Sequence, residues 1–71
     1  MKIDRQEALK IANEDAKIYY RDLSIYDVLI EIKNGNWKID YELKDKSSQG
    51  GGPHYIISST TGEIISKRYE Q

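Results

Sequence analysis

His54 is the only imidazole in this sequence, so any acid–base or metal chemistry that needs a histidine must use it. A histidine that acts as a general base needs an orienting partner and a nucleophile or water within reach. Ser58, Ser59 and Asp45 are candidates for those roles, but their spacing matches no catalytic triad. A metal site would need further ligands, and the sequence has no His-x-x-x-His pair and no carboxylate cluster. We therefore predict that His54 is a strand-edge or partner-contact residue and that no metal is bound.

Three consecutive glycines, at residues 50–52, precede Pro53 and His54. A glycine-rich loop can cradle a phosphate when it ends in Gly-Lys-Ser/Thr and opens a helix. This loop lacks the lysine, and the pattern of a strand follows it. The chain also has no cysteine, so it has no thiolate for nucleophilic attack. We predict a flexible connection, no cofactor and no enzymatic activity.

The balance of charge limits the kinds of partner. Eleven basic and 12 acidic side chains give a net charge of −1, and both signs are spread along the 71 residues. Without a basic stripe to neutralise phosphates, nucleic-acid binding is not expected. No apolar run approaches the roughly 18 residues of a membrane span, and the polar start Met-Lys-Ile-Asp-Arg is not that of a signal peptide. We expect a single domain, residues 1–71, in the cytoplasm and away from membranes.

A helix is predicted over residues 4–22. Asp4 is placed to cap its first turn, and Glu7, three residues later, completes an acidic variant of the capping box. At about 100° per residue, one arc of this helix collects the side chains that should face a core. These are Ala8, Leu9, Ala12, Ala16, Tyr19, Tyr20 and Leu23.

Residues 24–33 and 36–45 alternate between apolar and polar side chains, which is the pattern of half-buried strands. Asn34-Gly35 between them is the preferred type I′ hairpin turn, because both of its positions need a positive φ. This turn brings the large apolar side chains together on one face. The expected pairs are Ile32 with Trp37, Ile30 with Ile39, Val28 with Tyr41 and Tyr26 with Leu43.

A loop over residues 46–53 separates this hairpin from a second one, with strands over 54–60 and 63–69 joined at Thr61-Gly62. The whole pattern predicts an α+β fold, in which one N-terminal helix packs on a four-stranded antiparallel meander sheet. This is a two-layer, cystatin-like arrangement with one mostly solvated sheet face. On the second hairpin we expect Tyr55, Ile57 and Ile65 to face the helix and Ile56 and Ile64 to face outward.

Two surfaces are candidates for contact with a partner. Ile11 and Ile18 lie beside the core-facing arc of the helix, with Asp15 and Asp22 between them and that arc. One interpretation is a wide core-facing stripe whose margin includes two carboxylates; the other is an apolar-acidic patch that binds a partner. The second surface is the end of the loop, at Gly52, Pro53, His54 and Tyr55.

Short motifs along the chain resemble a known family. They are Trp-Lys-Ile-Asp-Tyr at residues 37–41, Gly-Gly-Gly-Pro at 50–53, Tyr-Ile-Ile at 55–57 and Thr-Gly-Glu-Ile-Ile at 61–65. They resemble the short bacterial immunity proteins with a nuclear-transport-factor-like fold. The sequence Glu-Ala-Leu-Lys-Ile-Ala at residues 7–12 also suits the first helix of that family. Members of that family are predicted to neutralise a cognate toxin encoded beside them in polymorphic toxin systems. The resemblance implies a toxin-binding inhibitor without catalysis and a reduced version of that fold.

Two alternatives remain open. Gln-Glu-Ala at residues 6–8 and Thr-Gly-Glu-Ile at 61–64 are similar to PepSY domains, small α+β modules linked to peptidase inhibition, although Ile57-Ser58-Ser59 lacks the Asp usual in that motif. The other alternative is a small dimerising accessory protein that uses a sheet edge or the outer face near Leu29, Ile56 and Ile64. We expect a monomer or a weak homodimer.

Overall fold

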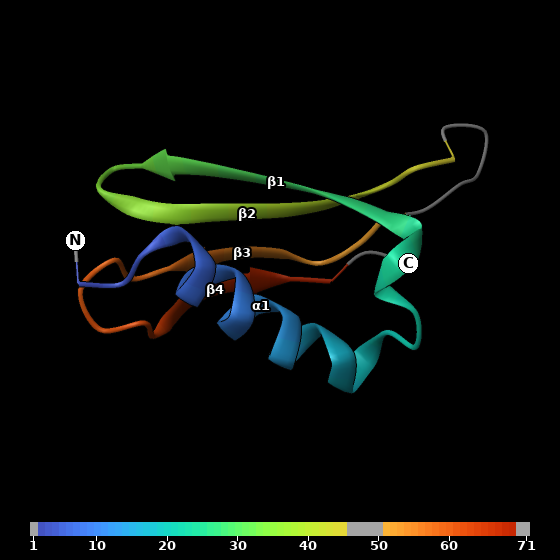
Figure 1. Ribbon diagram of the computed structural model, residues 1–71, viewed down its shortest axis with the longest axis horizontal. Helices are drawn as coiled ribbons and strands as arrows, with labels where there is room; N and C mark the ends of the chain where they lie inside the picture. The colour runs from blue at the N-terminus through green and yellow to red at the C-terminus, as the bar shows by residue number, and fades with distance from the viewer. Residues whose placement is uncertain (1, 46–50, 70–71) are drawn as a thin grey trace.

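One helix lies across one face of a four-stranded antiparallel sheet (Figure 1). The computed structural model describes residues 2–45 and 51–69. The strands lie in the order β1-β2-β3-β4, so each neighbour in sequence is also a neighbour in the sheet. The predicted α+β, two-layer meander is therefore confirmed. The elements are α1 (Arg5–Tyr19), a 3₁₀ turn η1 (Leu23–Ile25), β1 (Tyr26–Lys33), β2 (Asn36–Leu43), β3 (His54–Ile57) and β4 (Ile64–Arg68).

The start of α1 follows the sequence prediction. The Asp4 carboxylate accepts a hydrogen bond from the backbone N–H of Glu7 at 2.8 Å, which satisfies one of the N–H groups that the first turn leaves without an intrahelical partner. The cap residue itself is extended, with φ −85° and ψ 177°. Asp4 thus fixes where the helix begins.

The end of α1 differs from the prediction, because the helix stops at Tyr19 and Tyr20 is already extended. Asp22 explains the early stop, since its carboxylate accepts hydrogen bonds from the backbone N–H and the hydroxyl of Ser24 at 2.9 and 2.6 Å. This local capping begins η1 and competes with continuation of the helix. The predicted last helical turn and the first residues of the predicted strand form the connection instead.

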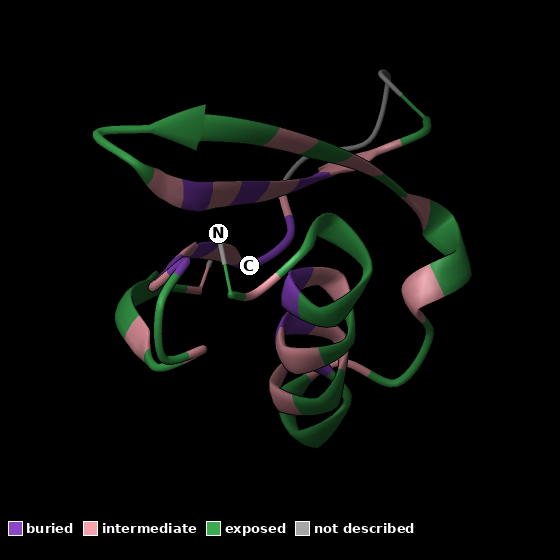
Figure 2. Ribbon diagram, turned by 60° about the vertical axis from the view of Figure 1, so that its left-hand side comes forward, coloured by how far each residue is buried: buried purple, intermediate pink, exposed green. Residues whose placement is uncertain are grey.

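The core lies between α1 and the middle of the sheet. Three small helical residues, Ala8, Ala12 and Ala16, are fully buried, so the helix backbone approaches the strands closely. The facing side chains alternate along β2 and β3, as the banded burial in Figure 2 shows. They are Trp37, Ile39 and Tyr41 of β2 and Tyr55 and Ile57 of β3.

The β1–β2 hairpin has the predicted turn and register. Asn34 and Gly35 have φ of +52° and +78°, as a type I′ turn requires. The four predicted pairs all occur, from Ile32 opposite Trp37 to Tyr26 opposite Leu43. The even-numbered residues of β1 therefore face α1, and its odd-numbered residues face outward.

The β3–β4 hairpin departs from the prediction at a β-bulge. The register shifts between Ile56 and Ile57, so that Ile57 pairs with Ile64. Ile64 packs against the core, while Ile65 is 55% exposed. The prediction that Ile65 faces the helix and Ile64 faces outward is wrong, because one extra residue in β4 reverses the alternation before the bulge.

Gly52 and Pro53 continue the pairing between β2 and β3 beyond the end of the regular strand. The N–H of Gly52 donates to the Tyr41 carbonyl at 3.2 Å, and the N–H of Tyr41 donates to the Pro53 carbonyl at 3.1 Å. A Cβ at Gly52 would lie 2.6 Å from the Tyr41 Cβ, so this position requires glycine. The predicted flexible loop lies outside the described residues at positions 46–50, and its end is a packed segment.

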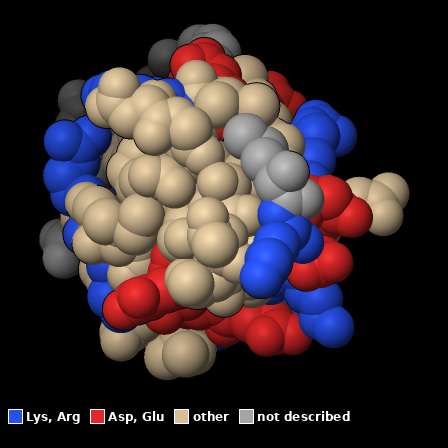
Figure 3. All heavy atoms as spheres, turned by 90° about the vertical axis from the view of Figure 1, so that its left-hand side faces the viewer, with Lys and Arg blue, Asp and Glu red and all other residues tan. Residues whose placement is uncertain are grey.

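The turns at one end of the molecule are tied to the N-terminal segment. The indole N–H of Trp37 donates to the Ile3 carbonyl at 2.8 Å, and the Ser59 hydroxyl donates to the Gly35 carbonyl at 2.6 Å. Figure 3 looks at this end and shows mostly uncharged atoms in its middle, with acidic and basic side chains around them. No single sign of charge dominates there.

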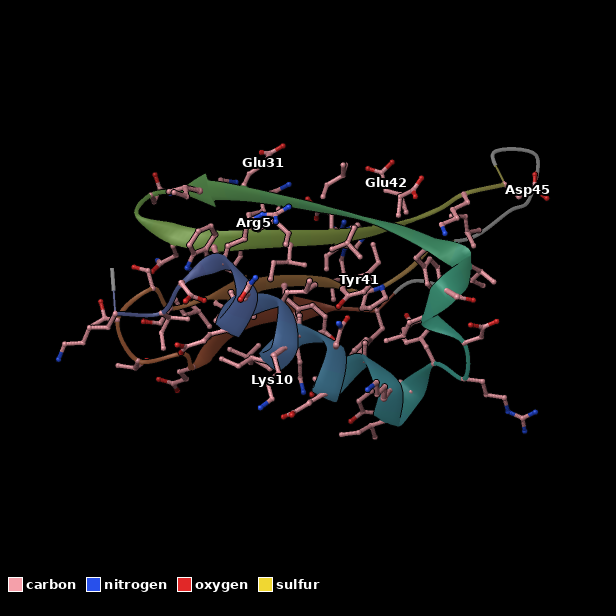
Figure 4. All side chains as sticks on the ribbon, viewed as in Figure 1. Arg5, Lys10, Glu31, Tyr41, Glu42 and Asp45 are labelled. Atoms are coloured by element: carbon pink, nitrogen blue, oxygen red, sulfur yellow. The ribbon has the colours of Figure 1, made fainter. Side chains whose placement is uncertain are left out.

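The second face of the sheet is not covered by α1. Figure 4 shows Glu31 and Glu42 projecting away from the helix, whereas Tyr41 points into the layer between helix and sheet. The strand register places a row of polar and charged side chains on this outer face. They include Lys38 and Asp40 of β2, His54 of β3, and Ser66 and Arg68 of β4.

Candidate functional site

A pocket of about 200 Å³ lies on the outer face, across β2, β3 and β4. Two cross-strand rows build it, because Asp40 pairs with His54 and His54 pairs with Arg68, while Lys38 pairs with Ile56 and Ile56 with Ser66. Residues that are far apart in sequence therefore meet on one surface. The lining is Lys38, Asp40, His54, Tyr55, Ile56, Ser66 and Arg68.

Asp40 is the shared partner of two other lining residues, Lys38 and His54. Its Oδ2 accepts a hydrogen bond from Lys38 Nζ at 2.5 Å, and its Oδ1 lies 2.7 Å from His54 Nδ1. An ionised carboxylate can only accept hydrogen bonds, so Nδ1 carries the proton in this pair. The Asp40 side chain is 14% exposed, against 31% for Lys38 and 22% for His54. The three side chains form an ordered polar network, which we call the Asp40 network.

The charges of the network are mutually stabilising. Burial raises the pKa of Asp40, but hydrogen bonds from Lys38 and His54 outweigh that effect and hold the pKa below its usual value. The hydrogen bond to Asp40 in turn raises the pKa of Lys38. Arg68, across from His54, adds a second cation to the lining. The pocket lining thus holds one carboxylate and two permanent cations, a positive balance that suits an acidic group from a partner.

The chemistry available in the pocket is limited by these pairings. An imidazole oriented by a carboxylate is one half of a general-base arrangement, and Ser66 is the hydroxyl residue in the same lining. Asp40, however, is shared with Lys38, which competes for the charge that would stabilise an imidazolium. Among the described residues, no group of three or more His, Asp and Glu side chains could hold a metal ion.

The four helix residues predicted as a partner surface do not lie on one surface. Ile11 is partly buried against the core, and Asp15 is turned toward β3 and β4. Ile18 is 70% exposed, whereas Asp22 caps η1. Ile11 and Asp15 therefore match the core-facing interpretation, and Ile18 alone keeps the accessible apolar surface that the patch interpretation requires.

Asp15 is the centre of a second polar network, between α1 and the sheet. It accepts hydrogen bonds from the hydroxyls of Tyr55 at 2.8 Å and Tyr69 at 2.5 Å, and Lys67 Nζ lies 3.5 Å away. Burial raises the pKa of Asp15, but these two hydrogen bonds and the charge of Lys67 outweigh it and leave the pKa below its usual value. For Tyr55, burial and the bond to Asp15 raise the pKa strongly. We call these four side chains the Asp15 network.

The predicted contact at the loop end is mostly interior. Gly52, Pro53 and Tyr55 are buried, and among the four residues only His54 contributes to the outer pocket. Sequence reasoning proposed His54 as a contact residue and missed Lys38, Asp40 and Arg68. Alternation placed Lys38 and Asp40 on the wet face, but their meeting with His54 needed the register between β2 and β3.

Compared with known proteins, the chain matches no family model, no curated protein and no solved structure. In the part of the chain that the structure describes, no helix is long and apolar enough to cross a membrane. The features of this protein that bear on its function are therefore its two polar networks and the open face of its sheet.

Proposed function

We propose that this protein is an immunity protein, which binds a cognate bacterial toxin domain in the cytoplasm and neutralises it without catalysis of its own. The observation that carries the proposal is the Asp40 network, an ordered set of charged and polar side chains on a sheet face that the helix leaves uncovered. The motif resemblance at residues 37–41 and 50–65 supports the same function.

The Asp40 network is suited to recognition because its side chains are ordered before any partner arrives. Lys38 and His54 are held in place by Asp40 and are only partly exposed, so binding costs less side-chain entropy than it would with free surface residues. Leu29, opposite Asp40 on β1, is 46% exposed and adds apolar area beside the network. Polar groups fix the orientation of a partner, and the apolar area strengthens its binding.

The proposed contact has a defined chemistry. Lys38 and Arg68 flank the pocket, so an acidic side chain of the toxin would be held there by charge-assisted hydrogen bonds. Such a contact changes affinity by roughly 2–5 kcal/mol when one partner of a desolvated pair is removed. Loss of either cation should therefore weaken binding strongly.

Co-expression with toxins encoded beside this gene tests the function. We expect one toxin to be neutralised in growth assays and to bind the purified protein in calorimetry. Arg68→Glu should weaken that binding at least about tenfold, whereas Lys10→Glu, a charge reversal at an exposed position on α1, should leave it unchanged. The proposal would be overturned if none of the neighbouring toxins binds this protein and none is neutralised by it in the growth assay.

Ile18→Asp separates the two candidate surfaces. If the toxin contacts the accessible end of α1, this change should weaken binding, because Ile18 is 70% exposed there. If the outer sheet face is the contact, Ile18→Asp should have no effect while Arg68→Glu does. Inhibition of a secreted peptidase instead of a toxin would favour the PepSY-like alternative.

A further inference from the structure

β1 forms a long, open edge of the sheet. Its eight residues pair regularly with β2 along one side, and it ends the strand order, so no described strand lies along its other side (Figure 1). Most of its ribbon is exposed (Figure 2). Edge strands of this kind are templates for pairing with another chain unless they are blunted.

The opposite edge of the sheet, β4, is blunted in ways that β1 is not. It has five residues, contains the register shift opposite Ile56 and Ile57, and carries Lys67 and Arg68 near its end. Short length, a bulge and positive charge are the usual devices against edge pairing. The regular edge at β1 is thus the one available for a partner.

The backbone groups that point away from β2 can be assigned from hydrogen bonds on either side. The Lys44 N–H donates to the Ile25 carbonyl, so the odd-numbered residues of β1 point their backbone groups toward β2. Tyr41 directs its backbone groups toward Gly52 and Pro53, so the even-numbered residues of β2 are those that bond to β1. In an antiparallel ladder these groups alternate. The N–H and C=O groups of Val28, Ile30 and Ile32 therefore point to the open edge.

We propose that two copies of this chain pair their β1 strands antiparallel, in a register centred on Ile30, to form a continuous eight-stranded sheet. In this register Ile30 lies opposite the partner's Ile30, and Val28 lies opposite the partner's Ile32, so the outward backbone groups meet in hydrogen-bonded pairs. Both helices lie on the same side of the sheet.

Charge complementarity selects this register from its neighbours. Centred on Ile30, Asp27 lies opposite the partner's Lys33 on the outer face, and the pair occurs twice by symmetry. A register centred on Leu29 would place Asp27 opposite the partner's Glu31, and one centred on Glu31 would place two glutamates together. Like charges directly opposite are destabilising, and opposite charges are favourable.

The surroundings of Asp27 also favour the arrangement. Within its own chain Asp27 is paired with Glu42 of β2, a residue of the same charge. Lys33 of a second copy would lie on the other side of Asp27 and bring an opposite charge to this pair of acidic side chains.

The apolar side chains of β1 gain cover in the same register. Ile32 is 57% exposed although it lies on the face that packs against α1, because it sits beside the turn at the end of the hairpin. The partner's Val28 would cover it there. On the outer face, the methylenes of the partner's Glu31 would lie against Leu29, which is 46% exposed.

This dimer does not rest on the proposed toxin-binding function. The pocket lies across β2, β3 and β4, so pairing at β1 leaves it open in both copies, although the partner's Glu31 would cover part of Leu29 beside it. Failure of the dimer would leave the proposed function untouched, and failure of every toxin to bind would leave the dimer untouched.

Sedimentation equilibrium over a range of concentrations tests the pairing, with mass expected to rise from 8.3 kDa toward twice that value. Asp27→Lys alone and Lys33→Asp alone should each weaken the dimer at least about tenfold, because each turns two favourable pairs into like-charge pairs. An equimolar mixture of the two variants should restore dimerisation, since both contacts between the chains are then complementary. The double variant should also restore it, and Lys17→Asp on α1 should change nothing.

Amide hydrogen exchange gives a test that needs no substitution. The outward N–H groups of Val28, Ile30 and Ile32 should exchange more slowly at high protein concentration, whereas those of Leu29 and Glu31 should already be protected in the monomer. A mass of 8.3 kDa at every concentration would overturn the proposal. So would a dimer that ignores both charge reversals, or protection confined to β4.

Discussion

Asp15 of α1 and Asp40 of β2 lie on opposite sides of the sheet and have similar local chemistry in different surroundings. Asp15 and Asp40 have side chains 15% and 14% exposed. Asp15 accepts hydrogen bonds from two tyrosines and lies near Lys67, whereas the two partners of Asp40 are Lys38 and His54. In both, burial raises the pKa, and the surrounding donors outweigh it. What differs is where the donors lie.

The donors of Asp15 belong to the layer between helix and sheet. Tyr55 is 1% exposed and stacks edge-on against Tyr41 and Tyr69, with ring centroids 6.2 and 6.4 Å away. The donors of Asp40 are Lys38 and His54, which remain partly exposed on the outer face. The position of the donors, rather than the carboxylate itself, therefore separates an aspartate that holds helix and sheet together from one that lies on the open sheet face.

Truncating the neighbouring residues Tyr55 and His54 should show the largest difference between the two networks. Tyr55→Ala should cost about 3–5 kcal/mol, because it empties a core site and removes a donor to Asp15. That loss approaches the whole stability of a domain this small, roughly 5 kcal/mol. His54→Ala should cost about 1 kcal/mol, since water can replace its hydrogen bond. Urea unfolding at pH 7 measures both, and equal losses would contradict the assignment of Asp40 to a displayed site.

Removing the charge of each aspartate without changing its shape should give the next largest effect. Asp15→Asn should destabilise the fold by about 1–3 kcal/mol, because the hydroxyls of Tyr55 and Tyr69 lose a charged acceptor inside the structure. Asp40→Asn should cost about 1 kcal/mol or less, since its donors are accessible to water. Under the proposed function, only Asp40→Asn should weaken binding of the toxin. A larger stability loss for Asp40→Asn would reverse the comparison.

Acid should weaken both networks in the same direction. Each folded pKa is lower than that of an aspartate in the unfolded chain, about 3.9, so the stabilisation is fully present above about pH 4 and is lost as pH falls through the folded values. For the unmodified protein, the urea concentration at the midpoint of unfolding should therefore decrease as the pH is lowered below about 4. The variant with both Asp15→Asn and Asp40→Asn should show a shallower fall, and an identical acid profile would count against the lowered pKa values.

Substituting Lys38 or Lys67 should give the smallest difference in stability loss between the two networks, because both lysines lie near water. Lys38→Met should change stability by about 1 kcal/mol or less, and the change should shrink in high salt. Lys67→Met should likewise give only a small change that shrinks in high salt, since its side chain is 43% exposed. Urea midpoints at low and high salt measure this, and a large salt-independent loss at Lys38 would place that residue with the structural groups.

The two hairpins differ in how well the sequence predicted them, because only the first has a turn with a clear local signal. The Asn34-Gly35 turn fixed the β1–β2 register, and that register makes the charge pattern of β1 readable from sequence. The pairing of β3 with β4 was mispredicted at Ile64 and Ile65, because a bulge has no clear local signal in this stretch. The helix end was also mispredicted, since Asp22 was interpreted as part of the helix, at the margin of its core-facing stripe or in a partner patch, and not as a cap of the following 3₁₀ turn.

The candidate site also depends on contacts between residues that local sequence patterns did not bring together. His54 was predicted as a contact residue from its solitary position, but Asp40 lies 14 residues away across a loop. The length of that loop sets no unique pairing, so sequence alone did not place Asp40 beside His54. Gly52 and Pro53 were predicted as partner-contact candidates at the end of the loop, but they are buried and their backbones bond to Tyr41.

Local chemistry in the sequence determined the first half of this protein. A capping aspartate, three alanines spaced four residues apart and an Asn-Gly turn act over a few residues, so their consequences follow without knowledge of the fold. Only the tertiary structure decided which aspartate became structural. Asp15 meets Tyr55 and Tyr69 across 40 and 54 residues of chain, and such distant contacts depend on how the second hairpin docks, because alternation along a strand assigns a face but not a neighbour.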